Sequence, residues 1–365
     1  MNILLITSSL NERNGWGRYS HDLALALKAE GHDVYILCYS SVESDIDVPQ
    51  YAVLPDPHRF FSAYYRSGTY VAQSLSKLNG ISFDVVHVVV EPYAHIARKI
   101  AKELNIPFVV TVHGTYSIKT LRSPPYAWLQ KKAYRSAKKV ICVSAYTERR
   151  LTEKVALNNT VVIPNGIIID DAFAGEKTDT DPYILSVGPL KRRKGHLITI
   201  EALSLIADRF NSLKLVIVGA SENATYVQKI KERIQEENLG QRVECIKEVT
   251  EEQLHDLYRN ATVFALPSQS DEYNFEGFGL VYLEANAYGI PVIGARDSGA
   301  EDAIADGKSG FLIDPRDPKQ LAEKIELLLS DVAIYELLSK GALVWAEEHR
   351  WDKIVKEYDK VYSLL

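Results

Sequence analysis

Asn2-Ile-Leu-Leu-Ile-Thr7 is an apolar run with the length of a buried strand. A polar loop follows it, and residues 19–30 then carry apolar side chains at helical spacing up to Gly31, a helix stop signal. The next apolar run is Val34-Tyr-Ile-Leu-Cys38. The order strand, helix, strand predicts two parallel strands joined by a right-handed crossover, which is the building unit of an α/β sheet.

The same alternation recurs in two series along the chain. The first series continues with apolar runs at residues 85–90, 108–112 and 139–143. After an acid-rich stretch, a second series follows at residues 183–187, 213–218, 243–246, 262–266, 291–293 and 311–313. Because 365 residues exceed one ordinary core, we expect two domains. We place them at residues 1–172 and 173–348, with a terminal helix, 349–365, that crosses back to the first domain.

Cysteine usage and hydropathy indicate a cytoplasmic protein. Cys38, Cys142 and Cys245 lie far apart without metal-like spacing, so neither a disulfide framework nor a zinc site is favoured. The first apolar run lacks a basic leader and a cleavage pattern, and no run of about 18 apolar residues occurs. We therefore expect a chain that is neither secreted nor membrane-spanning.

The charge is distributed unevenly. The net charge is -6, yet residues 1–171 hold 19 Lys and Arg against 15 Asp and Glu. A basic patch within this half comprises Lys131, Lys132, Arg135, Lys138 and Lys139. Such a patch can contact an anionic membrane or an anionic acceptor. We favour the other interpretation, a solvated helix face whose core-facing stripe is formed by Trp128, Leu129, Ala133, Tyr134 and Ala137. We expect no nucleic-acid partner.

The segment Glu276-Gly-Phe-Gly-Leu-Val-Tyr-Leu-Glu284 carries two carboxylates around a glycine turn. If residues 277–280 begin a helix, the free N–H groups of its first turn favour an anion such as a diphosphate. Glu284 would lie about one turn further along and accept hydrogen bonds from hydroxyl groups of the same ligand. The motif follows a predicted strand, and open α/β sheets bind ligands at that strand end. The alternative is a surface helix with two solvated glutamates.

A glycine loop and a histidine follow two strands of the first series. Gly15-Trp-Gly17-Arg18-Tyr19 offers close approach of the backbone to a ligand, although it lacks the third glycine of a dinucleotide fingerprint. His113-Gly114 ends the run 108–112 and therefore points to the carboxyl edge of the sheet. The alternative for the glycine loop is a turn without a ligand, and the alternative for His113 is a histidine with a structural role.

The second series begins with a strand followed by four consecutive cations, Lys191-Arg-Arg-Lys194. Such a cluster can offset the charge of a diphosphate, with lysine as a point charge and arginine as a two-pronged donor. The alternative is a solvated basic turn.

Together these motifs resemble the retaining glycosyltransferases of family 4. The family's GT-B fold is α/β, with two Rossmann-like domains whose parallel sheets face each other across a cleft. The resemblance runs from the first strand to the helix at Trp351. It is carried by Gly15 to Gly17, His113-Gly114, Lys194-Gly195, Glu276 to Glu284 and Gly289-Ile-Pro-Val292.

The resemblance implies a role for each matching residue. Lys194 would contact the donor diphosphate, Glu284 the ribose and Glu276 the transferred sugar. The implied catalytic residues are His113 and Glu276, and the implied acceptor-side residues are Gly15, Arg18 and Tyr19. The implied donor-binding residues are Gly17, Gly188, Arg192, Arg193, Lys194, Phe278, Gly279, Leu280 and Glu284. The family usually has arginine where this chain has Pro189, so Arg192 or Arg193 would supply that charge.

The implied activity is transfer of a hexose from a GDP- or UDP-linked sugar to a hydroxyl acceptor, with retention of configuration and without a metal or other cofactor. The acceptor would be a glycan or a lipid-linked glycan of surface polysaccharide synthesis, reached from the cytoplasm or the inner face of the membrane. Gly17-Arg-Tyr19 is similar to mannosyl-transferring members. The alternatives are a sugar nucleotide epimerase on the same fold and a non-catalytic scaffold that binds a sugar nucleotide.

Overall fold

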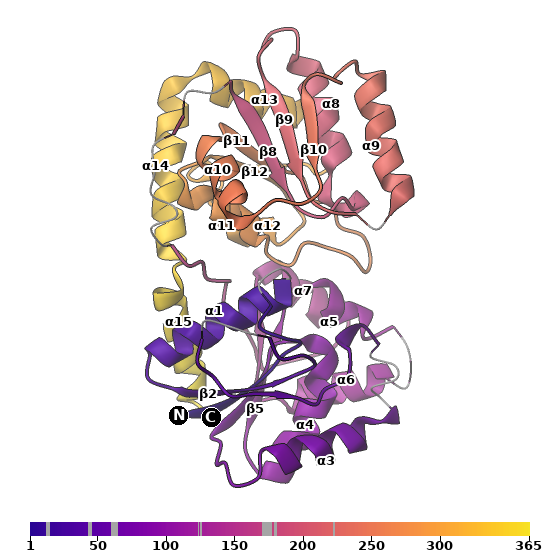
Figure 1. The fold of residues 1–365 in the computed structure, drawn as a ribbon, viewed down its shortest axis with the longest axis vertical. Helices are drawn as coiled ribbons and strands as arrows, with labels where there is room; N and C mark the ends of the chain where they lie inside the picture. The colour runs from indigo at the N-terminus through magenta and orange to yellow at the C-terminus, as the bar shows by residue number, and fades with distance from the viewer. Residues whose placement is uncertain are drawn as a thin grey trace. The chain divides into compact units, whose positions relative to one another are not determined.

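The chain forms two compact units (Figure 1). The computed structural model describes residues 1–11, 15–42, 46–59, 65–122, 124, 126–169, 177–178, 181–221 and 223–365. Unit 1 comprises Met1–Gly166 and Trp351–Leu365, and unit 2 comprises Ile167–Arg350. The expected boundary between residues 172 and 173 lies outside the described residues, and the change of unit at Gly166 precedes it.

Unit 1 is built on a parallel sheet of seven strands in the order β3-β2-β1-β4-β5-β6-β7. These strands are β1 Asn2–Ile6, β2 Asp33–Cys38, β3 Gln50–Ala52, β4 Val85–Val88, β5 Phe108–Val112, β6 Lys139–Cys142 and β7 Thr160–Val162. The strands β3 and β7 were not predicted. Each has only three residues, none of which is buried, so both lack the longer buried run by which the other strands were predicted.

The helices of unit 1 lie on both faces of its sheet. They are α1 Gly15–Ala29, α3 Ser67–Lys77, α4 Ala94–Leu104, α5 Thr115–Lys119, α6 Tyr126–Ser136, α7 Ala145–Thr152 and α15 Trp351–Tyr362, with 3-10 turns η1 Pro57–Arg59 and η2 Glu91–Tyr93. On one face α4 packs between α3 and α6, and on the other α15 packs against α1, yellow beside indigo in Figure 1. The buried side chains of α15 recur at helical spacing: Trp351, Ile354, Val355, Tyr358, Val361 and Tyr362.

Unit 2 is built on a parallel sheet of six strands in the order β10-β9-β8-β11-β12-β13. Its strands are β8 Tyr183–Val187, β9 Lys214–Val218, β10 Val243–Ile246, β11 Val263–Leu266, β12 Val292–Ala295 and β13 Gly310–Ile313. Its helices are α8 His196–Ile206, α9 Ala224–Glu236, α10 Glu251–Asn260, α11 Leu280–Ala287, α12 Ala300–Ala303, α13 Pro318–Ser330 and α14 Val332–Glu348, with a 3-10 turn, η4 Arg192–Lys194. Helix α8 packs with α9 and α13, while α11 packs with α12 and α14.

Each sheet has one point at which the strand order reverses. It lies between β1 and β4 in unit 1 and between β8 and β11 in unit 2. At such a point the loops that leave neighbouring strands run to opposite faces, and the carboxyl ends of those strands border a crevice. The crevice of unit 2 is therefore bordered by the loops after β8 and β11, which carry the four cations and the Glu276 motif.

In the described part of the chain, no helix is both long enough and apolar enough to cross a membrane.

Candidate active site

The centre of the unit 2 site is the carboxylate of Glu276, in the loop after β11. Its Oε2 accepts hydrogen bonds from Lys194 Nζ at 2.6 Å, Arg193 Nη1 at 3.0 Å and Ser268 Oγ at 3.2 Å. The Glu276 side chain is 12% exposed and that of Lys194 is 8% exposed. Two cations from the loop after β8 thus meet one carboxylate from the loop after β11.

The buried cluster has strongly perturbed ionisation. Burial raises the pKa of Glu276, but the positive charges of Lys194 and Arg193 outweigh it and lower that pKa from 4.5 to about 2. Burial lowers the pKa of Lys194 despite the attraction of Glu276. The carboxylate is therefore ionised at neutral pH and paired with Lys194 and Arg193.

Gly195 explains how the two loops come together. Its φ is +76°, and a Cβ there would lie 2.1 Å from the Pro267 carbonyl oxygen, so only glycine fits between η4 and the loop after β11. This close approach brings Lys194 to Glu276. Of the two candidate arginines, Arg193 contacts Glu276, whereas exposed Arg192 makes no such contact in the described structure.

The amino end of α11 lies directly after Glu276. The expected helix start at residues 277–280 is observed at Leu280, with Gly279 as N-cap in the left-handed region. No side chain caps this end, and within the described ranges the backbone N–H groups of Phe278, Gly279 and Leu280 have no acceptor. Free N–H groups and the helix dipole favour an anion here.

Glu284 lies one turn further along α11 and is half-buried. Its Oε2 accepts a hydrogen bond of 2.8 Å from the hydroxyl of Tyr258 on α10. The sequence motif singled out Glu284 but not Tyr258, since a tyrosine between predicted elements carries no signal of its own.

His113 in unit 1 follows β5 and is half-buried. Its Nε2 lies 2.9 Å from the Val89 carbonyl oxygen, so this nitrogen donates and Nδ1 carries no proton in the neutral ring. Burial lowers the pKa of His113 to about 4, and the ring is neutral at pH 7. The ring also meets that of Tyr19 edge to face at 4.4 Å.

Glu91, which the sequence analysis missed, fixes the backbone beside His113. Its buried carboxylate accepts from His113 N at 2.8 Å and from Trp16 Nε1 at 3.1 Å. Burial raises the pKa of Glu91 to about 7, although these hydrogen bonds oppose the rise. A lone acidic residue inside the apolar stretch 88–97 was the available signal, because a buried carboxyl group needs dedicated partners.

The predicted glycine loop is partly helical. Helix α1 begins at Gly15, so Gly15, Gly17 and Arg18 lie in its first turns instead of in a loop. A Cβ on Gly17 would lie 1.9 Å from the Asn11 carbonyl oxygen, which makes glycine necessary there. Residues 12–14 of this segment lie outside the described residues.

Tyr19 is buried, and its hydroxyl hydrogen-bonds the hydroxyl of Tyr358 on α15. Its contacts therefore join the ring of His113 to the terminal helix.

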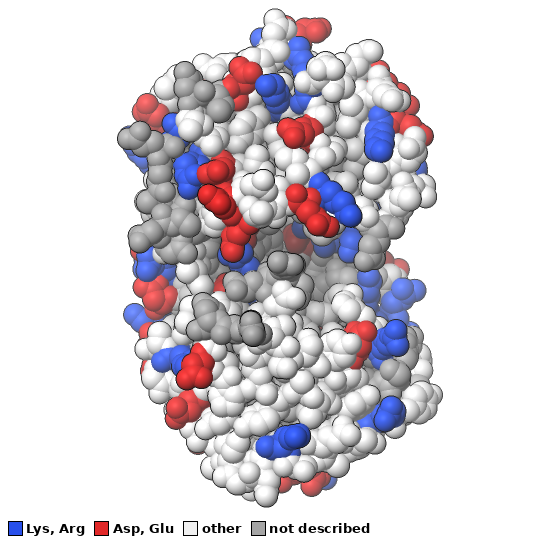
Figure 2. Space-filling model, viewed as in Figure 1, with Lys and Arg blue, Asp and Glu red and all other residues white. Residues whose placement is uncertain are grey.

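The structure corrects the predicted core stripe of α6. Trp128 is 62% exposed, whereas Ala133, Tyr134 and Ala137 are buried as expected. The Lys132 ammonium lies 5.0 Å from the centre of the Trp128 ring. Figure 2 shows Lys and Arg side chains gathered on the side of unit 1 where Figure 1 places α5 and α6.

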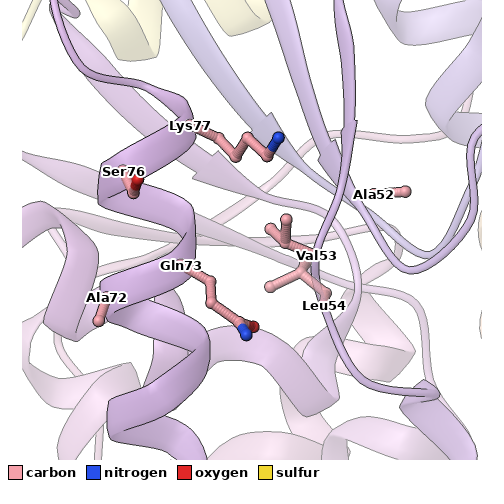
Figure 3. A pocket seen from close by; sticks show the side chains of 7 residues that line it. All are labelled: Ala52, Val53, Leu54, Ala72, Gln73, Ser76 and Lys77. Carbon is pink, nitrogen blue, oxygen red and sulfur yellow. The ribbon is translucent and has the colours of Figure 1, made fainter.

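Unit 1 also contains a pocket that lies apart from the candidate site residues. It lies between α3 and the segment after β3, and Gln73 and Lys77 point from α3 toward Val53 and Leu54 (Figure 3). No candidate site residue lines it. Among the described residues, no cluster of His, Cys, Asp and Glu could hold a metal ion.

Comparison with known proteins identifies the family. Residues 13–171 match the family model described as Glycosyltransferase Family 4, and residues 168–343 match Glycosyl transferases group 1. The chain belongs to the family 4 glycosyltransferases. It is 26% identical to an uncharacterised glycosyltransferase of Methanocaldococcus jannaschii, over 91% of this chain and 90% of that protein. It is 28% identical to a glycogen synthase of Mycobacterium tuberculosis, over 90% of this chain and 85% of that protein.

Solved glycosyltransferases share the fold. Sucrose-phosphate synthase from Thermosynechococcus elongatus matches with a TM-score of 0.78 and 22% identity, over 100% of this chain and 98% of that one. Anabaena HepE in complex with UDP-glucose matches with a TM-score of 0.81 and 18% identity, over the full length of both chains. The GT-B fold expected from the sequence is confirmed.

Proposed function

We propose that this family 4 glycosyltransferase transfers a hexose from a nucleoside diphosphate sugar to a hydroxyl acceptor with retention of configuration. The observation that carries the proposal is the cluster of Lys194 and Arg193 on Glu276, directly before the uncapped end of α11. Two cations and a set of free N–H groups on the same two loops favour a diphosphate. We assign the ribose hydroxyls to Glu284, one turn further along α11.

The chemical step needs stabilisation of the leaving group. The bond between the anomeric carbon and the diphosphate oxygen breaks, and its electron pair goes to that oxygen. Lys194, Arg193 and the N–H groups before α11 stabilise the charge that develops, so the residues supply what a metal ion supplies elsewhere. The acceptor oxygen bonds to the anomeric carbon from the face that the diphosphate leaves, and its proton passes to the departing phosphate oxygen. Retention follows from this same-face attack.

Glu276 has a second role in the proposal. Its carboxylate balances Lys194 and Arg193. When the diphosphate binds, its oxygens take over part of that interaction, and Glu276 becomes available to accept hydrogen bonds from the hexose hydroxyls. In unit 1, the residue proposed to serve the sugar is His113, whose ring is neutral and whose backbone N–H is held by Glu91.

The proposed acceptor is a glycan or a glycolipid, reached at a membrane surface through α6. This helix presents Trp128, Lys132 and Arg135 to solvent and contains no acidic residue. Cations and a tryptophan on one exposed helix face suit an anionic lipid surface, because lysine and arginine attract the headgroups and the ring inserts at the interface.

Product analysis tests the function. The protein is incubated with UDP-glucose or GDP-mannose and a panel of alkyl glycosides, in excess chelator, and the new linkage is assigned by nuclear magnetic resonance. We expect the anomeric configuration of the donor in the product and a rate that the chelator does not change. An inverted linkage, or activity lost on chelation and restored by a divalent ion, would contradict the proposal.

The same assay separates the alternatives. Isomerisation of the sugar nucleotide in the absence of acceptor would indicate an epimerase, and tight donor binding with no product across the panel would indicate a scaffold. If the protein is a glycosyltransferase, Lys194→Ala should abolish sugar transfer, because the diphosphate loses its buried countercharge.

A further inference from the structure

The hydrogen bond between Tyr258 and Glu284 has no function in the scheme above. Glu284 is the residue proposed to bind the ribose of the donor. A glutamate side chain has three rotatable bonds, so an unsupported carboxylate samples many positions. A residue that fixes this carboxylate would determine how well it meets a hydroxyl pair.

The surroundings of Tyr258 restrict its side chain to one position. It is 3% exposed on α10, and its ring stacks on Tyr288 at 5.6 Å and 11° and lies 6.1 Å from the ring of Phe264. The Tyr288 hydroxyl in turn hydrogen-bonds the ring of His255, also on α10. Helix α10 itself begins with a capping box formed by Thr250 and Gln253.

Glu284 depends on this contact. Its hydrogen bond from Tyr258 measures 2.8 Å, and no other hydrogen bond or ion pair to Glu284 occurs within the described parts of the chain. An ionised carboxylate has about four acceptor positions, so one oxygen can be held while the other binds a ligand. Tyr258 occupies Oε2, which leaves Oε1 for the donor.

We propose that Tyr258 is a positioning residue that holds the Glu284 carboxylate for the ribose hydroxyls of the sugar nucleotide. The inference rests on the proposed function, because it assigns the partner of a residue in the same site. It also predicts a specific signature: Tyr258 should affect only nucleotides whose ribose hydroxyls Glu284 can bind.

The test compares Tyr258→Phe with wild type by calorimetric titration with UDP, 2′-deoxy-UDP and 3′-deoxy-UDP, with GDP and ADP as alternative bases. Phenylalanine keeps the ring between Phe264 and Tyr288 and removes only the hydroxyl. We expect ribose nucleotide binding to weaken about 3- to 30-fold, which is less than the loss of a full hydrogen bond to a charged group, because Glu284 remains and only its position is released. The deoxy analogue that lacks the bound hydroxyl should bind the two proteins equally.

Tyr183→Phe is the matched control. Tyr183 is also a buried tyrosine whose hydroxyl donates to α10, to the Leu257 carbonyl oxygen at 2.6 Å. This variant also loses one hydrogen bond from a tyrosine hydroxyl, here to a backbone carbonyl, without touching Glu284. It should keep the wild-type preference for ribose over deoxyribose, even if its melting temperature falls.

A double-mutant cycle with Glu284→Gln completes the design. Tyr258→Phe should add nothing further in the Glu284→Gln background. Equal UDP affinity of Tyr258→Phe and wild type, or equal losses for UDP and both deoxy analogues, would overturn the positioning role while the donor site stands. Failure of wild type to bind any of the three nucleoside diphosphates would overturn the proposed function and this inference together.

Discussion

At the scale of single residues, the site is distinguished by a carboxylate that is buried among cations. Glu276 is held by Lys194 and Arg193, and the side chains of Glu276 and Lys194 are largely buried. Removing one member of a buried pair is far more costly than breaking a surface pair, because the remaining charge keeps its desolvation penalty. The charges proposed to bind the donor are therefore paired with one another in the structure.

Glu276→Gln should remove a pH-dependent part of the stability. The pKa of Glu276 is depressed to about 2 in the folded state, from an ordinary value of 4.5, and this difference corresponds to about 3 kcal/mol. A depressed pKa gives stability that is present above the unfolded value and lost as the pH falls through the folded value. Urea unfolding should thus show wild type about 3 kcal/mol more stable than Glu276→Gln near pH 6, with the gap closing toward pH 2.

Glu244→Gln provides the comparison for this experiment, because Glu244 is exposed in unit 2. Its stability should follow that of wild type at every pH. A difference in unfolding free energy between wild type and Glu276→Gln that stays constant with pH would contradict the depressed pKa of Glu276 and its pairing with the two cations.

At the scale of elements, the ends and faces of helices were harder to predict than their existence. The apolar residues of α6 follow helical spacing, but Trp128, which was assigned to the core-facing stripe, is exposed to solvent. Helix α1 begins at Gly15, although glycine is a poor helix former, because the tight contact of Gly17 with Asn11 decides the local geometry. At both places the residue pattern alone did not predict the observed geometry.

Reversing two charges on α6 tests its proposed contact with membranes. Lys132→Glu combined with Arg135→Glu should weaken binding to phosphatidylcholine vesicles that contain phosphatidylglycerol at least about tenfold, since each cation near an anionic surface contributes about 1 kcal/mol. Vesicle sedimentation at low and high salt measures the effect. Lys229→Glu with Lys231→Glu makes the same charge change at exposed positions of α9 in unit 2 and should bind like wild type. Equal binding of both double variants, or no binding by wild type, would rule out α6 as the contact.

At the scale of the whole molecule, the two units differ in how the chain builds them. Unit 2 is one continuous segment, whereas unit 1 needs residues 1–166 and 351–365. In unit 1 the Tyr362 hydroxyl lies 2.6 Å from His87 Nδ1, and the Tyr358 hydroxyl meets that of Tyr19. The terminal helix therefore completes the core of unit 1 beneath His113.

Separate expression of the units tests this division. A fragment of residues 167–350 should unfold cooperatively and bind the nucleoside diphosphate that the full chain binds. A fragment of residues 1–166 should show no cooperative transition, because the large buried side chains of α15 each contribute about 1.5–3 kcal/mol and a domain has only about 5–15 kcal/mol in total. Circular dichroism during urea unfolding measures both, and adding residues 351–365 through a flexible linker should restore the transition. Cooperative unfolding of residues 1–166 alone would contradict the dependence on α15.

The sequence was sufficient for the fold class and for much of the donor-side constellation. Apolar runs predicted the long buried strands, and the positions of Lys194 and Glu276 after two strands follow from the order of the elements. Tyr258 was beyond reach, because only tertiary packing brings it to Glu284. The apolar stretch around Glu91 signalled a buried carboxyl group, but its partner at His113 could not be predicted. The choice between Arg192 and Arg193 likewise depended on which side chain turns toward Glu276.

The path of the chain through α15 also has a consequence during synthesis on the ribosome. Residues 351–365 emerge from the ribosome only after the whole of unit 2. Synthesis of unit 2 takes roughly ten to forty seconds at about 5–20 residues per second. During that interval the nascent first unit exposes the surface around Tyr19 and His87 that α15 later covers. Unit 2 is therefore the first part that can reach its final state, and the newborn first unit presents a site for chaperones.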